Sequence, residues 1–263
     1  MVLKSVTIWL LFYSNNIYAD GLSAIEIVEK ANGVEKVREW VARSTIKIIS
    51  KNGFARTREG ISFNKRQKNN DVSHRRFEFI GPADIKGTVV ITHEKTNNDD
   101  MWIYLPGLNR VRRILSSSKK NSFVGSDFSY ADVVSFKTSD YKHLKLNNEG
   151  CEKVNCFVIE SKPKNKEVLK SYGYSKIVSW IGDVNFLTFK VQYYDEQTRL
   201  LKTQLISNYK KISGYSDKWI AKYKEMTNNQ NGHMSTIDIS NIKVDTGIKS
   251  TKFSASRLRQ IAN

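Results

Sequence analysis

The chain has 263 residues, a formal net charge of +17 and a hydrophobic content of 40%. This length allows one large domain or two small ones, and the lack of a Pro-rich or Gly/Ser-rich linker favours one domain over residues 20–263. The four histidines are scattered without the spacing of metal ligands, so the sequence predicts no metal site and no cofactor.

Residues 1–19 have the features of a secretory signal peptide. Lys4 supplies a positive charge, residues 6–13 are apolar, and Ile17 and Ala19 precede a cut before Asp20. The apolar run is too short to span a bilayer as a permanent helix. We therefore expect cleavage near Ala19 and export to the periplasm, with an uncleaved N-terminal anchor as the alternative. Because no cysteine lies near the cut, a lipid-anchored N-terminus is not expected.

The strong positive charge has several interpretations. Nucleic acid is one class of partner for such a chain, but the predicted export argues against it. Anionic membrane surfaces, lipid phosphates and simple solubility remain. Since the basic residues are spread along the chain, a solvated surface is the default interpretation.

Residues 23–32 predict a short amphipathic helix, which Asn32 and Gly33 end. Beyond it the apolar period changes to two, as expected for strands, and aromatic and β-branched residues are frequent. The expected strands are residues 46–50, 54–62, 76–80, 87–92, 101–105, 111–114, 141–146, 155–161, 174–180, 186–194, 200–207, 219–227 and 236–244. Regular spacing and short turns predict a meander, in which sequence neighbours pair.

Two segments do not follow this pattern. Residues 116–140 mix polar residues with isolated aromatics, and a stretch of this length in a compact domain is usually functional or carries its own short helix. Residues 253–261 are expected to form a final short helix or a tail.

The elements together predict a mainly β fold, a curled antiparallel sheet forming a half-open barrel with a short helical lid. A single sheet of this length must curl and bury its concave face. An apolar hollow of this kind is where apolar ligands bind. The alternative is an interior that the protein's own side chains fill completely.

Eight apolar residues are candidates for ligand contact, although ordinary core is the favoured interpretation of each. They are Phe77, Phe79, Trp102, Tyr104, Val111, Phe123, Phe128 and Tyr130.

The densest basic cluster consists of Arg110, Arg112, Arg113, Lys119 and Lys120. We favour ion pairing with Asp127 and Asp132 in the following segment. Contact with a lipid phosphate or an acidic partner is the functional alternative.

Cys151 and Cys156 are expected to form a disulfide in an exported chain, worth about 2 kcal/mol for so short a loop. Two free thiols are the alternative.

The chain shows no recognisable catalytic motif. It contains no Gly-x-Ser-x-Gly elbow, no paired-histidine metal motif and no phosphate-binding glycine loop. Ser126 beside Asp127 could still meet His93 or His143 in space, but such residues occur in any chain of this length. We therefore expect a protein that is not an enzyme, with a hydrolase as a remote alternative.

The run from Asp84 to Val133 resembles the outer-membrane lipoprotein-sorting protein family, which is LolA-like in fold. The residues that carry the resemblance are 84–88 (DIKGT), 101–106 (MWIYLP), 110–114 (RVRRI) and 123–132 (FVGSDFSYAD). Weaker similarity extends over nearly all of the chain beyond the predicted signal peptide.

This resemblance implies a half-open antiparallel barrel in the periplasm, with relatives that bind acyl chains of lipoproteins or other hydrophobic molecules. It implies a carrier whose partners are lipid or lipoprotein acyl chains and an inner-membrane transporter, and no nucleic acid. A periplasmic sensor of the same fold, which binds a membrane protein without transporting lipid, is the alternative.

Overall fold

The computed structural model describes residues 21–67, 72–96, 98–151 and 154–258. The predicted signal peptide, residues 1–19, lies outside these ranges. Within them, no helix is both long and apolar enough to cross a membrane.

In the described ranges, 14 strands form one antiparallel sheet, in the order β6-β5-β4-β3-β2-β1-β14-β13-β12-β11-β10-β9-β7, with β8 paired to β9 beside this path. The bounds are β1 Glu39–Ile49, β2 Ala55–Arg66, β3 Ser73–Gly81, β4 Val89–His93, β5 Asp100–Leu105, β6 Arg110–Ile114, β7 Tyr141–Lys145, β8 Glu149–Cys151, β9 Val154–Pro163, β10 Lys176–Gly182, β11 Thr188–Tyr194, β12 Leu200–Lys211, β13 Trp219–Asn228 and β14 Met234–Val244.

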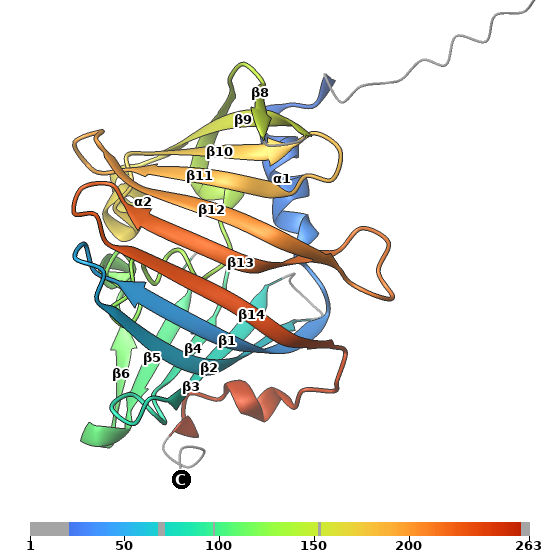
Figure 1. Cartoon of the computed structure of the whole chain (residues 1–263). Helices are drawn as coiled ribbons and strands as arrows, with labels where there is room; N and C mark the ends of the chain where they lie inside the picture. Colours follow the sequence, from blue (N-terminus) through green and yellow to red (C-terminus); the bar gives the residue numbers. More distant parts are fainter. Residues whose placement is uncertain (1–20, 68–71, 97, 152–153, 259–263) are drawn as a thin grey trace, which may run out of the picture.

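The sheet consists of two meanders that the first and last strands join. Sequence neighbours pair from β1 to β6 and from β9 to β14, as the spacing predicts, but β1 pairs with β14 and β7 pairs with β9. The sheet curls around a concave face and does not close, because β6 and β7 remain its two edges (Figure 1). The predicted fold class, a mainly β half-open barrel, is confirmed.

Helix α1 (Ala24–Val34) begins with a capping box between Ser23 and Glu26. Its buried face, Ile27 and Val28, packs on the concave side of β9 and β10. The helix therefore covers part of the hollow that the sheet encloses (Figure 1).

A second helix, α2 (Lys166–Tyr172), was not predicted. Asn165 caps its first turn by accepting a hydrogen bond from the Val168 amide, and Gly173 ends it in the left-handed conformation with φ 77°. At 7 residues it is too short to produce a clear helical period in the sequence.

The C-terminal segment covers the outer face of β3, β4 and β5. It contains the 3₁₀ turn η5 (Ser250–Phe253), and Leu258 is fully buried against Val89, Ile91 and Tyr104. His93 makes a hydrogen bond of 2.7 Å with the Phe253 carbonyl. The outer face of these three strands is therefore covered, and β4 is buried on both faces.

Candidate functional site

The concave face of the sheet surrounds a cavity of about 840 Å³. Its walls come from both meanders, from α1 and from the segment between β6 and β7. This volume lies in the range of about 300–1,000 Å³ that is typical of small-molecule sites. The interior is therefore not filled by the protein's own side chains.

One part of the cavity wall is apolar. Successive residues along a strand point to opposite faces of the sheet, so every second residue of β1, β3, β12 and β14 points inward. The apolar lining includes Ile46, Phe77, Val90, Phe123, Phe128, Ile206 and Ile237.

A neighbouring part of the wall, on β2, β3 and β4, is polar. The register pairs Asn64 with Arg75 and Arg75 with Thr92, and all three line the cavity. Glu94, which directly follows β4, accepts a hydrogen bond of 2.7 Å from Arg75 Nε. The exposed lining residues Glu29, Glu35, Lys95 and Thr96 mark the opening beyond this polar part.

Residues 115–140, called the lid here, cover the cavity from its apolar part, where Phe123 and Phe128 lie, to its polar part, where Ser135 contacts Arg75 and Glu94. The lid includes the 3₁₀ turns η3 (Ser116–Ser118) and η4 (Thr138–Asp140). Phe123 packs its ring edge-on against Phe77 and Tyr130, with centroids 5.7 and 5.6 Å away. The segment predicted to be functional or locally helical is thus a cap of short turns over the cavity.

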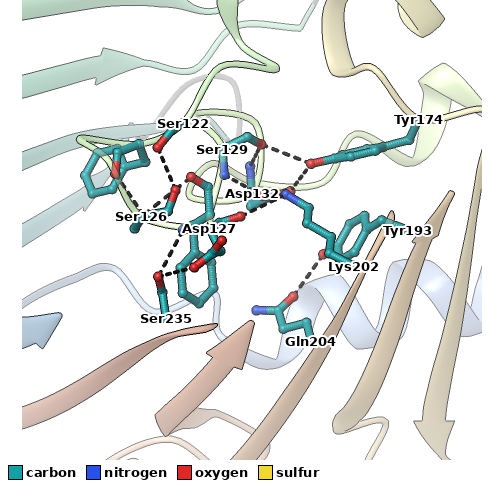
Figure 2. Close-up of polar contacts among 12 residues, drawn as sticks. Ser122, Ser126, Asp127, Ser129, Asp132, Tyr174, Tyr193, Lys202, Gln204 and Ser235 are labelled. Carbon is teal, nitrogen blue, oxygen red and sulfur yellow. Dashed lines mark hydrogen bonds and ion pairs between the residues drawn. The ribbon is translucent and has the colours of Figure 1, made fainter. Parts of the chain in front are cut away.

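A buried ion pair fastens the lid to β12. Lys202 Nζ lies 2.5 Å from an Asp132 carboxylate oxygen, and the other oxygen accepts a 2.8 Å hydrogen bond from the Tyr174 hydroxyl (Figure 2). The ammonium group also lies 5.1 Å from the Tyr174 ring and 5.3 Å from the Tyr193 ring. Burial and the Asp132 charge raise the pKa of both tyrosines, so they stay neutral donors at physiological pH.

Two further contacts hold the lid against β2 and β14. Ser235 on β14 donates from its hydroxyl to Asp127 over 2.6 Å and accepts from the Asp127 amide over 3.0 Å (Figure 2). Arg58 on β2 donates to the Val124 carbonyl. The lid is therefore tied to both meanders at once.

The ends of the lid meet at one buried carboxylate. Asp99, just before β5, lies 2.8 Å from both Lys119 and Lys137. Burial alone would raise the pKa of Asp99, but the hydrogen bonds from the two lysines outweigh burial and hold the pKa below its usual value. Asp99 thereby closes the base of the lid.

The structure places the eight predicted contact residues in three groups. Phe77, Phe123 and Phe128 line the cavity. Phe79 and Tyr130 belong to the adjoining core.

The third group, Trp102, Tyr104 and Val111, packs on the outer face against the C-terminal segment and does not line the cavity. Sequence reasoning missed Ile46, Val90 and Ile237, although the alternation of β1 and β14 carries their signal.

The basic cluster does not pair with Asp127 and Asp132, contrary to the favoured interpretation. Arg113 pairs with Asp100, Lys119 with Asp99 and Lys120 with Glu196. Arg110 and Arg112 are exposed on the edge strand β6. Asp132 instead forms its ion pair with Lys202, which is 70 residues away in sequence.

The catalytic alternative has no assembled counterpart in the described ranges. The Ser126 hydroxyl donates to the Phe123 carbonyl over 2.8 Å. His143 contacts Ser161 and the Thr138 carbonyl, and His93 contacts Phe253. At the far edge of the sheet, Cys151 and Cys156 form a disulfide.

Comparisons with known proteins agree on the fold. A family model described as an uncharacterized protein matches residues 72–260. An outer membrane lipoprotein-sorting protein domain from Vibrio parahaemolyticus is 29% identical over 90% of this chain and 98% of its own, with a TM-score of 0.83. A DUF1329 family protein from Desulfovibrio piger is 28% identical over 89% and 97% of the two chains, with a TM-score of 0.82.

A more distant LolA superfamily protein from Nitrosomonas europaea, 21% identical, covers 89% of this chain and 98% of its own with a TM-score of 0.68, which supports the fold alone. None of the curated proteins matches the chain. The chain belongs to the family whose model it matches, and within the LolA-like fold it is a relative of the outer membrane lipoprotein-sorting proteins.

Proposed function

We propose that this protein is a periplasmic carrier that holds the acyl chain of a lipid or lipoprotein in its cavity and performs no covalent chemistry. The observation that carries the proposal is the cavity of about 840 Å³ between the apolar wall and the lid. Similarity to an outer membrane lipoprotein-sorting domain supports the direction of transfer, toward the outer membrane.

The energetics suit a carrier. Each buried methylene group contributes about 0.8 kcal/mol, so one long acyl chain contributes on the order of 10 kcal/mol. Release then requires a second state in which the cavity is less favourable. Opening of the lid provides this second state. Phe123 and Phe128 form part of the apolar lining, so an opening lid removes both side chains from the cavity.

Transfer of a fluorescent phospholipid between donor and acceptor vesicles tests the proposal. Ile237→Trp adds a large side chain inside the cavity, whereas Leu205→Trp adds the same side chain on the exposed face of β12. We expect the wild-type protein and Leu205→Trp to accelerate transfer and Ile237→Trp to lose the acceleration while remaining folded by circular dichroism. Equal transfer by both variants, or none by the wild type, would refute the carrier.

A further inference from the structure

The cavity wall contains three polar side chains that lie next to one another. Asn64, Arg75 and Thr92 sit on β2, β3 and β4 in directly paired register. Side chains paired in this way have Cβ atoms about 4.5–5.5 Å apart. Together they form a continuous band, called the polar band here, across the cavity wall.

Two members of the polar band are buried without a protein partner. Asn64 is 6% exposed and Thr92 is 4% exposed. Neither side chain makes a hydrogen bond to any residue that the structure describes, and both line the cavity. The polar atoms of Asn64 and Thr92 are not among the described side-chain atoms that are fully buried without a partner, so they open onto the cavity, where water or a ligand can satisfy them.

Arg75 adds charge to the band and is only partly engaged. Its Nε donates to Glu94 over 2.7 Å and its Nη2 donates to Ser135 over 2.9 Å. Glu94 also accepts from the Ser135 amide and hydroxyl and from the Ser73 amide. Among the described residues, Arg75 Nη1 has no acceptor, so this nitrogen can donate to a further group.

The next inward position along the same strands is apolar. Phe77 lies two residues from Arg75 on β3, and Val90 lies two residues from Thr92 on β4, with Phe77 and Val90 paired to each other. The wall thus changes from polar beside Glu94 to apolar beside Phe123 and Phe128 of the lid. A molecule that satisfies both parts has a head with hydrogen-bond acceptors and a hydrocarbon tail.

We propose that the polar band binds the anionic oxygen group of an acyl lipid, with the chain directed toward Phe77 and the lid. The inference rests on the proposed carrier function and specifies its ligand. The Asn64 amide, the Thr92 hydroxyl and the free Arg75 nitrogen are all donors, and a carboxylate or phosphate accepts several donors at once. A plain hydrocarbon would leave these donors buried without partners.

The test compares probes that share one end-labelled acyl chain. A fluorescent fatty acid is measured against its primary alcohol, and a fluorescent phosphatidic acid against the corresponding diacylglycerol. We expect at least one anionic probe to bind about tenfold or more tightly than its uncharged counterpart, as hydrogen bonds to a charged group predict. Preference for the fatty acid alone or for phosphatidic acid alone identifies the source of the anionic group.

Two variants, Asn64→Leu and Thr92→Val, test whether the polar band causes the preference for anionic probes. Thr45→Val, on the outer face of β1, is the control. Both band variants should weaken the anionic probes about tenfold, leave the uncharged probes unchanged and not lower the melting temperature. A purely structural role would instead lower the melting temperature and affect all probes alike. Arg75 is left intact because it also holds Glu94 and Ser135.

The outcomes separate the two proposals. If all four probes bind equally well, or if the band variants leave a wild-type preference unchanged, the head-group assignment is refuted and the carrier stands. If no probe binds the wild-type protein at any acyl length, the carrier and the head-group assignment both fail.

Discussion

Lys202 on β12 lies 2.5 Å from Asp132 on the lid, and the two side chains are 6% and 1% exposed. This buried pair connects the wall of the cavity to its cover. Removing one partner of such a pair leaves a charge buried without compensation, which typically costs about 3–5 kcal/mol.

We therefore expect Lys202→Met to lower the free energy of unfolding by about 3 kcal/mol and to increase hydrogen exchange in lid residues 119–133. Urea denaturation and hydrogen–deuterium exchange measure the two effects. Lys120→Met is the matched control, because Lys120 is a lid residue that pairs with Glu196 at the exposed surface. An exposed pair of this kind contributes less than about 1 kcal/mol. Equal effects of the two variants would show that the buried pair does not hold the lid.

Gly60 on β2 marks a close approach of Phe77 to the sheet. A Cβ at this position would lie 2.3 Å from the Phe77 ring and 2.9 Å from the Glu78 carbonyl oxygen. Gly60→Ala should therefore displace Phe77 and destabilise the protein by about 1–3 kcal/mol. Gly107→Ala, where no heavy atom lies within 4 Å of the added Cβ, should change stability little in the same thermal melts. A neutral Gly60→Ala would contradict the packing of Phe77.

His74 makes stability depend on pH. Burial and the nearby His93 lower the pKa of His74 from 6.5 to about 4. The folded protein thus binds this proton less readily than the unfolded chain. His74 therefore leaves the free energy of unfolding at its full value above pH 6.5 and lowers it as the pH falls toward 4.

His74→Phe keeps a ring beside His93, 4.0 Å away in the native stack, and removes this titration. The melting temperature of the variant should fall less than that of the wild type between pH 6.5 and 4. His233→Phe, at an exposed position, should retain the wild-type slope. Identical slopes for the wild type and His74→Phe would mean that His74 titrates normally.

The disulfide between Cys151 and Cys156 closes a loop with a sequence separation of 5. For so short a loop the chain-entropy estimate is about 2 kcal/mol. Replacing both cysteines with serine should lower the free energy of unfolding by this amount. A reducing agent should lower the melting temperature of the wild type and leave the double variant unaffected; sensitivity of the double variant to reduction would contradict this account.

Much of the fold could be predicted because local patterns specify it. The strand spacing, the helix capped by Ser23 and the irregular lid segment all have local signals. The pairing of β1 with β14 could not be predicted, because it joins residues about 200 positions apart and depends on the curl of the whole sheet. The lid contact between Asp132 and Lys202 is non-local in the same way.

The candidate site was predicted only in part, for two physical reasons. Residues 101–105 are apolar throughout because the C-terminal segment buries the outer face of β5, so no alternation indicates that Trp102 and Tyr104 point away from the cavity. The polar band exists only through the register of β2, β3 and β4, which brings together Asn64, Arg75 and Thr92.

Native mass spectrometry of the protein purified from cells that produce it tests the central claim most directly. We expect the folded wild type and Leu205→Trp to carry the added mass of one acyl lipid, and Ile237→Trp, whose larger ring narrows the cavity, to carry less. A folded wild type without lipid, or equal lipid retention by Ile237→Trp, would contradict a carrier that holds its cargo in this cavity.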